Sequence, residues 1–159
     1  MDIKIKKAKN KDYEDVNRML TNLHNYHAKN SNVFFEITQY YTKKEYEKRI
    51  AKNHRIYIAK VDNKSVGVIE IGIKYCNISI SAIYVDEEYR KLGIGKKLIE
   101  KILKYYNNHK KELSGDITLQ VFDFNKNAIE FYKNLGFSYE RHIMEFNKAQ
   151  KINNEKIKS

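Results

Sequence analysis

The sequence predicts an α+β fold in which about four helices flank one mixed, mostly antiparallel sheet. Two observations favour this class. Three strand-like segments follow one another closely in the middle of the chain and are joined by short turns, which is typical of an antiparallel meander. Segments with apolar residues at helical spacing lie on both sides of them. The predicted order of elements is β-α-α-β-β-β-α-β-α-β.

The N-terminal part of the chain predicts one strand and two helices. Ile3 to Ile5 alternates apolar and basic residues, as a short strand does. From Asp12 to about Ala28, apolar residues recur at helical spacing and predict an amphipathic helix. Thr42 followed by Glu45 matches a capping box, which predicts a second helix ending near Lys52.

The rest of the chain predicts five strands and two helices. The strands are expected at Arg55–Val61, Ser65–Tyr75, Asn77–Val85, Asp116–Val121 and Phe137–Phe146. The helices are expected at Gly95–Asn107 and Asn125–Asn134, the second ended by Gly136. We expect one domain over residues 1–146 and a polar, basic, frayed tail over residues 147–159.

Length and composition narrow the class of protein. A chain of 159 residues is long enough for one domain that buries roughly 70% of its unfolded surface. Without a long apolar segment or a signal peptide, we expect a soluble, cytoplasmic protein that has no membrane partner. Cys76 is the single cysteine, so an internal disulfide is excluded. The net charge of +11 comes from lysines spread through every segment, which makes nucleic acid an unlikely main partner.

The segment from Tyr84 to Ile99 carries the clearest chemical signal. An apolar strand runs through a basic loop with Gly93 and Gly95 into an amphipathic helix. A helix start offers unpaired N–H groups and a positive dipole end, and glycine lets the backbone approach an anion. The loop therefore predicts a pyrophosphate site. A dinucleotide fingerprint is excluded because Leu98 stands where its third glycine would be, and the spacing does not fit a Walker loop either.

Two motifs together identify a family resemblance. The pattern Arg90-x-x-Gly93-x-Gly95 resembles the acetyl-coenzyme A pyrophosphate loop of the GNAT superfamily of N-acetyltransferases. Downstream, the segment from Asn125 to Phe137, with Ala128, Tyr132 and Gly136 in register, resembles the segment that follows the fifth strand in that superfamily. The predicted order of elements is also the GNAT order, and the matching region runs from about Val66 to Phe146.

The resemblance implies a binding site for acetyl-CoA, used as co-substrate without a metal. Backbone amides from Lys91 to Lys96 would bind the pyrophosphate, with Arg90 positioning the loop. Residues 83–85 would hold the pantetheine arm, and an amide there would polarise the thioester carbonyl. Asn125 would contact the pantetheine from the far side. The implied coenzyme-binding residues are Ile83, Tyr84, Val85, Arg90, Lys91, Leu92, Gly93, Ile94, Gly95, Lys96, Asn125 and Tyr132.

Two residues are candidates for catalysis. By the same resemblance, Tyr132 would lie beside the coenzyme sulfur and protonate the departing thiolate; the alternative is that its ring packs on the sheet. Glu70 lies in an otherwise apolar strand, so we interpret it as a candidate proton acceptor, and the alternative is that it faces solvent or pairs with a lysine. Ser79 and Ser81, where some family members carry a base, cannot deprotonate an ammonium.

Other residues have weaker interpretations. Phe34 and Phe35 could bind the acceptor substrate, and core packing is an equal alternative. His24 and His27 lie three residues apart on the predicted helix, and an ordinary helix-face role is favoured over a metal pair.

The predicted function is transfer of an acetyl group from acetyl-CoA to a primary amine by direct attack in a ternary complex. A small-molecule acceptor is expected, such as a polyamine, amino acid or aminosugar. A protein or peptide amine, and a non-catalytic acyl-CoA sensor, are the alternatives, and a homodimer is left open.

Overall fold

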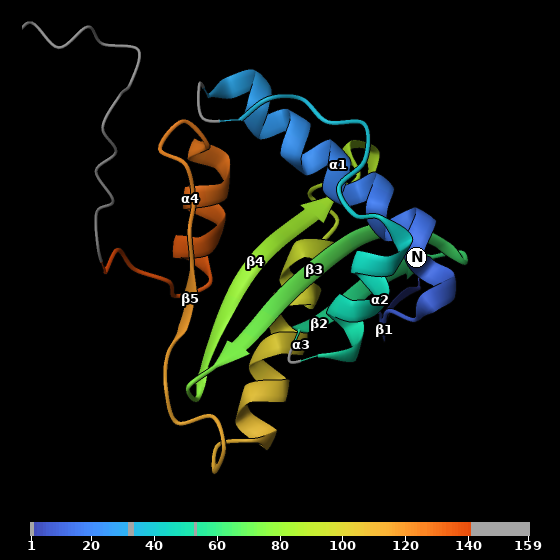
Figure 1. Ribbon diagram of the computed structural model, residues 1–159. Helices are drawn as coiled ribbons and strands as arrows, with labels where there is room; N and C mark the ends of the chain where they lie inside the picture. Colours follow the sequence, from blue (N-terminus) through green and yellow to red (C-terminus); the bar gives the residue numbers. More distant parts are fainter. Residues whose placement is uncertain (1, 32–33, 53, 141–159) are drawn as a thin grey trace, which may run out of the picture. The chain divides into compact units, whose positions relative to one another are not determined.

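In the computed structural model, five strands form one sheet in the order β1-β2-β3-β4-β5 (Figure 1). The structure describes residues 2–31, 34–52 and 54–140. The chain divides into two units, Met1–Asn125 and Lys126–Ser159, and each is considered by itself. The elements of the first unit are β1 (Ile3–Lys7), η1 (Asn10–Asp12), α1 (Tyr13–Asn30), α2 (Lys43–Ala51), β2 (His54–Val61), β3 (Lys64–Lys74), β4 (Asn77–Val85), η2 (Glu87–Tyr89), α3 (Ile94–Asn108) and β5 (Ile117–Leu119).

The meander predicted for the middle of the chain is confirmed. Strands β1 to β4 pair antiparallel in chain order, and β5 pairs parallel with β4. The β2–β3 turn has Asp62 and Asn63 at positive φ, and the β3–β4 turn has Tyr75 and Cys76 at positive φ. Two consecutive left-handed residues match the right-handed twist of the flanking strands, which favours tight hairpins. The α+β, mostly antiparallel fold class is therefore confirmed.

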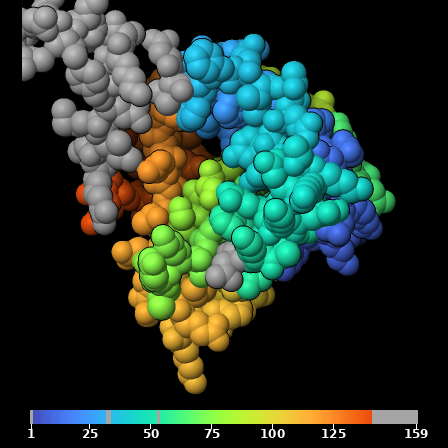
Figure 2. Space-filling view, viewed as in Figure 1, coloured from blue at the N-terminus to red at the C-terminus, as the bar shows by residue number. Residues whose placement is uncertain are grey.

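Helices cover both faces of the sheet. On one face, α1 and α2 enclose the main hydrophobic core, and α3 runs across the other face (Figure 1). Figure 2 shows α1, the following segment and α2 over the first face, with the β3–β4 hairpin at its edge. The core of this face consists of Ala8, Val16, Met19, Leu20, Tyr46, Ile56, Ile58, Val68 and Ala82. Leu98, Ile99 and Ile102 bury the facing side of α3.

The predicted start of α2 is confirmed in detail. Thr42 caps the helix by accepting a hydrogen bond from the Glu45 N–H at 3.3 Å, and the Glu45 carboxylate accepts the Thr42 N–H at 2.8 Å. Each side chain thus satisfies a backbone donor that the first helical turn leaves open.

A β-bulge in β4 opens the sheet beside β5. In the β3–β4 ladder Glu70 lies opposite Ala82 and Ile71 lies opposite Ile80, so Ser81 is the extra residue. Strand β5 pairs only with Ile78 to Ile80, the part of β4 that precedes the bulge. Because a bulge bends its strand, β4 turns away from β5 after Ile80. This explains why β5 has three residues rather than the six predicted for Asp116–Val121.

The second unit contains helix α4 (Lys126–Asn134). Gly136 follows at a φ of +92°, and its N–H donates to the Lys133 carbonyl at 3.0 Å, which closes the helix as predicted. Residues 137–140 form no strand. The rest of the strand predicted for Phe137–Phe146, and the tail over 147–159, lie outside the described residues. Across the described part of the chain, we find no helix with the length and apolar character to cross a membrane.

Candidate active site

The loop before α3 presents an open helix N-terminus. Gly93 is the N-cap residue of α3, with a φ of 79° and no side-chain cap hydrogen bond, and the Lys97 N–H is bonded to the Gly93 carbonyl at 3.1 Å. The N–H groups of Ile94, Gly95 and Lys96 precede that bond and have no intrahelical partner. The first turn of α3 contains no acidic residue. An anion such as a pyrophosphate fits these donors and the positive end of the helix dipole.

The space around the loop also suits an anion. A Cβ added at Gly93 would meet nothing within 4 Å, and Lys91, Leu92 and Gly93 are exposed. Lys91 itself has a φ of 63°, a conformation that costs an L-residue free energy. The loop backbone is therefore curved and exposed at Lys91 to Gly93. These residues fit the pyrophosphate of the coenzyme that the sequence predicts for this loop.

Two arginines brace this loop. Arg90 donates from Nε to the Val85 carbonyl at 3.1 Å, and its guanidinium lies 5.8 Å from the centre of the Tyr84 ring. Arg18 of α1 holds Asp86 through two hydrogen bonds of 2.8 and 3.1 Å. These bonds to Asp86 raise the pKa of Arg18, so the guanidinium remains charged. The Arg90 contact is of the kind expected of a residue that positions the loop.

The edge of β4 beyond the bulge is available for a ligand with an extended backbone. Ile83, Tyr84 and Val85 pair on one side with Ile69, Val68 and Gly67 of β3. On the other side, the part of β5 that the structure describes ends its pairing at Ile80. An extended amide chain such as a pantetheine arm fits such an edge, because a strand edge presents regularly spaced N–H and C=O groups.

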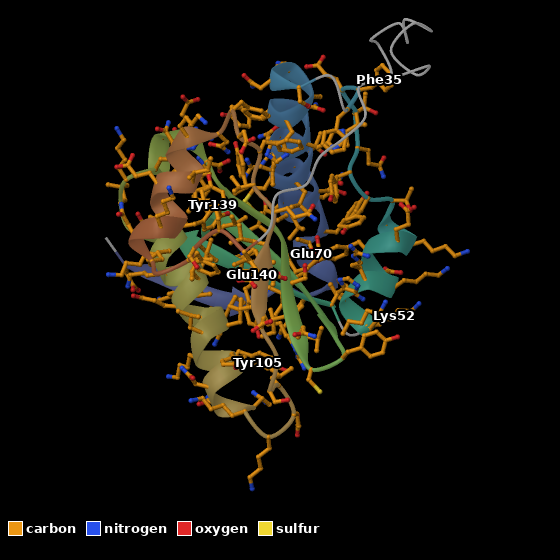
Figure 3. All side chains as sticks on the ribbon, turned by 90° about the vertical axis from the view of Figure 1, so that its left-hand side faces the viewer. Phe35, Lys52, Glu70, Tyr105, Tyr139 and Glu140 are labelled. Carbon is orange, nitrogen blue, oxygen red and sulfur yellow. The ribbon has the colours of Figure 1, made fainter. Side chains whose placement is uncertain are left out.

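Glu70 is fully buried and partnered. Its side chain has 0% exposure, and Arg49 of α2 donates to Oε1 from Nε at 2.7 Å. The Tyr41 hydroxyl donates to the carboxylate, with both oxygens at 3.0 Å. Figure 3 shows Glu70 in the interior, whereas Lys52 lies at the outer end of α2. Glu70 therefore neither faces solvent nor pairs with a lysine, the two alternatives considered from sequence.

A hollow of about 340 Å³ opens on the sheet beside Glu70. Its lining residues come from β2, β3 and β4, and they are His54, Gly72, Ile73, Lys74, Asn77, Ser79 and Ser81. Ser81 is the bulged residue, so the hollow reaches the point where β4 leaves β5. Its volume suits a small molecule or a single side chain.

The predicted acceptor residues Phe34 and Phe35 have different surroundings. Phe35 is 90% exposed, and its side chain projects at the periphery in Figure 3. The Phe34 ring lies 5.2 Å from His24 and 5.9 Å from Phe122. Phe34 belongs to an aromatic cluster that consists of His24, Tyr26, His27, Phe34, Phe122 and Phe124. The two histidines thus make ring contacts, and among the described residues no group of three or more potential ligands could hold a metal ion.

Tyr132 lies in the second unit, on α4. It is buried, and its ring lies 5.3 Å from Phe131 and 5.8 Å from Phe137. Burial raises the pKa of Tyr132 to about 12, so the phenol is protonated at neutral pH. Asn125, the last residue of the first unit, donates its backbone N–H to the Phe122 carbonyl at 2.9 Å.

Several residues of this region carry no signal in the sequence. His54, Arg49 and Arg18 stand among many other basic residues, and their partners lie 16 to 68 positions away. Only the strand register and the packing of α1 and α2 bring them to Glu70 and Asp86. An isolated acidic residue in an apolar strand was the one available hint, and it identified Glu70 but not its partners.

Comparisons with known proteins agree with this geometry. The model of the acetyltransferase (GNAT) family matches residues 20–137. An uncharacterized N-acetyltransferase of Methanocaldococcus jannaschii is 32% identical over 111 residues, which cover 62% of this chain and 48% of that protein. A thialysine N-epsilon-acetyltransferase of Sus scrofa is 40% identical over 60 residues, which cover 38% of this chain and 34% of that protein. The matched region thus spans less than half the length of these curated relatives.

Solved structures share the fold. A tetramutant of the BH1408 protein of Bacillus halodurans superposes with a TM-score of 0.81 at 25% identity, covering 91% of this chain and 99% of that one. The PaiA N-acetyltransferase of Thermoplasma acidophilum, solved in complex with coenzyme A, superposes with a TM-score of 0.73 at 23% identity, covering 88% and 92%. Sheet, helices and glycine loop define an acetyltransferase fold. The chain belongs to the GNAT acetyltransferase family, because the family model matches more than half of its residues.

Proposed function

We propose that this protein transfers an acetyl group from acetyl-CoA to a primary amine of a small molecule. The observation that carries the proposal is the combination of an uncapped α3 N-terminus at Gly93 with the free edge of β4. The first fits the pyrophosphate of the coenzyme and the second fits its pantetheine arm. The bound thioester would supply an activated acetyl group.

The hollow on the sheet has room for the amine-bearing part of an acceptor. Its volume of about 340 Å³ suits an amine carried on a short chain, and its lining offers hydroxyl, amide and imidazole groups beside the ammonium group of Lys74. The relative named as a thialysine N-epsilon-acetyltransferase carries an acceptor of this class in its name. A peptide amine is the second candidate, because a lysine side chain could enter the same hollow.

Each catalytic candidate has a defined task in this proposal. The acceptor amine attacks the thioester directly, without an acyl-enzyme, since Cys76 lies exposed in the β3–β4 turn. Backbone N–H groups at residues 83–85 would polarise the thioester carbonyl. Tyr132 would donate a proton to the departing sulfur. Glu70 would help to remove the proton of the acceptor ammonium, and because its side chain has no exposed surface it would do so through an intervening group.

Two measurements test the function. Acetyl-CoA should raise the melting temperature, because a ligand that binds only the folded state stabilises it, by about 2.7 kcal/mol at 100 times Kd. Thiol release should then be measured with spermidine, thialysine, glucosamine and a lysine-containing peptide as acceptors. Binding of acetyl-CoA without thiol release for any amine would identify a sensor instead of an enzyme.

Variants test the assigned residues. Tyr132→Phe should lower the rate of thiol release while leaving the Kd for acetyl-CoA unchanged, because only the phenolic hydroxyl group is removed. An unchanged rate would exclude Tyr132 from the mechanism. Glu70→Gln should change the pH–rate profile, and a profile equal to that of the wild type would exclude the carboxylate.

A further inference from the structure

His54 lies between the buried carboxylate of Glu70 and the hollow on the sheet. Its Nδ1 is 3.7 Å from the Glu70 Oε1 and is buried, and no described residue lies within hydrogen-bond distance of it. The side chain is 29% exposed. His54 also lines the hollow, and of its two ring nitrogens Nδ1 is the one that is buried without a hydrogen-bond partner among the described residues.

Gly72 allows this placement of the ring. His54 of β2 and Ser79 of β4 both pair with Gly72 of β3, so the three residues form one row across the sheet. A Cβ at Gly72 would stand 3.2 Å from the His54 Cε1, which is tighter than ordinary contact. The imidazole therefore lies over a strand position without a side chain. From there the hollow extends to Ser81, where the free edge of β4 begins.

We propose that His54 is a catalytic residue that accepts the proton of the acceptor ammonium in the hollow, with Glu70 as its positioning residue. The inference rests on the proposed function and names the group that contacts the acceptor, because Glu70 has no exposed surface. The Glu70 Oε1 is the acidic oxygen nearest to Nδ1, at 3.7 Å, which favours the tautomer that carries the ring proton on Nδ1. That tautomer leaves the lone pair of Nε2 free to take a proton.

Burial, together with nearby positive charges, favours a neutral His54 ring at pH 7. Burial and the positive charges of Arg49 and Lys52 lower the pKa of His54, while the negative charge of Glu70 acts in the opposite direction. Lys74 also lines the hollow, and the Tyr41 hydroxyl faces the same carboxylate. A neutral imidazole is the form that a general base needs.

The proton balance is complete without a further reactant. The acceptor R–NH₃⁺ gives one proton to Nε2 and becomes R–NH₂, whose lone pair forms the new C–N bond while the C–S bond of the thioester breaks. The departing sulfur takes up one proton and the nitrogen gives up its second proton, so this exchange leaves the proton count unchanged. His54 releases its proton to solvent. The sum is one acetamide, one free thiol and one proton.

The test compares His54→Gln with His109→Gln, a matched control at the residue that follows α3, whose ring bonds to the Tyr105 carbonyl. We expect His54→Gln to lower kcat/KM for the acceptor about 100-fold or more at pH 7, in the range of general base catalysis. The loss should shrink as pH rises toward the pKa of the acceptor, because the amine then arrives deprotonated. The Kd for acetyl-CoA should stay within twofold of the wild type, and His109→Gln should match the wild type throughout.

A second measurement does not depend on turnover. In the wild-type protein labelled with ¹⁵N, the His54 ring should carry its proton on Nδ1 at pH 7, and Glu70→Gln should weaken this preference. A proton on Nε2 at pH 7 would overturn the inference even if His54→Gln failed to fold.

The outcomes separate the two proposals. A wild-type protein that releases thiol, with His54→Gln showing an unchanged rate and pH profile, overturns the role of His54 and leaves the proposed function standing. A variant that loses acetyl-CoA affinity in proportion to its rate overturns it too, because the role would then be structural. A wild-type protein that releases no thiol with any amine overturns the proposed function and this inference together.

Discussion

Replacing Gly93 by alanine tests the phosphate-binding loop most directly. Gly93 has a φ of 79° and a ψ of 2°, and a Cβ there would meet no atom within 4 Å. The cost of Gly93→Ala is therefore a backbone cost alone, about 1.5 kcal/mol for an L-residue in the left-handed region. For a chain of this size that corresponds to a fall in melting temperature of about 3–6 °C.

The same substitution should weaken coenzyme binding through the added methyl group. The methyl group would occupy open space in the loop that precedes the N–H groups of Ile94, Gly95 and Lys96. Losing one hydrogen bond to a charged pyrophosphate costs about 1.5–3 kcal/mol, or about 10- to 150-fold in Kd. Isothermal titration with coenzyme A should show this loss. Titration with pantetheine, which lacks the pyrophosphate, should not.

Two further variants separate backbone conformation from binding. Gly93→Asn should recover much of the stability, since asparagine tolerates the left-handed region, but not the affinity. Lys91→Gly should retain the stability of the wild type or increase it, because Lys91 has a φ of 63°. Equal coenzyme A affinity for the wild type, Gly93→Ala and Gly93→Asn would refute the assignment of the loop.

Three other substitutions test the surrounding contacts. Arg49→Met should destabilise the fold by about 2–3 kcal/mol, measured by urea unfolding, because Glu70 would remain buried without its ion pair; the usual 3–5 kcal/mol is reduced because Arg49 is 37% exposed. Asp86→Asn should cost about 1–2 kcal/mol and weaken coenzyme A binding a few-fold in titrations, since Arg18 would lose its charged partner. Burial and the charge of His24 lower the pKa of His27. The unfolded state therefore binds more protons, and the free energy of unfolding should fall as pH drops below about 6.5. His27→Phe should make this decline shallower in urea melts at pH 5.5 and 7.5.

The controls lie next to the substituted residues. Lys48→Met, on the same helix as Arg49, and Glu87→Gln, next to Asp86, change exposed charges and should stay within about 0.5 kcal/mol of the wild type. Equal stability of Arg49→Met and Lys48→Met would contradict the importance of the ion pair. Equal coenzyme affinity of Asp86→Asn and Glu87→Gln would contradict the bracing of the loop. A His27→Phe protein with the same pH dependence as the wild type would show that another group is responsible.

The sequence predicted best what depends on neighbouring residues. Strand β4 was predicted at its observed bounds because apolar residues alternate with serines from Ile78 to Ala82 and an apolar run continues to Val85. The capping box at Thr42 and the glycine loop at Gly93 are local patterns as well. The bulge at Ser81 was not predicted. That β4 has one residue more than β3 at this point is seen only when the two strands are paired. The position of His54 depends on that register and on Gly72 of a different strand.

The site was predicted only as far as local patterns reach, because contacts between distant elements are not visible in the sequence. The isolated charge of Glu70 in an apolar strand was visible, but its ion pair with Arg49 joins two elements that only the packing of α2 on the sheet brings together. Phe122 and Phe124 contact α1 through a loop that has no regular spacing. Such contacts need the three-dimensional arrangement of several elements, each of which contributes only one or two residues.

The bulge at Ser81 has a consequence for insertions and deletions in this strand. Without Ser81, Ile80 and Ala82 would be consecutive, and they already face opposite Ile71 and Glu70 in the positions that a regular ladder requires. Ser81 is therefore superfluous to the pairing of β3 with β4. A single-residue deletion would leave every other side chain of β4 on its present face and remove the bend that separates this strand from β5. One inserted residue therefore accounts for a bend at the point where the pairing of β4 with β5 ends.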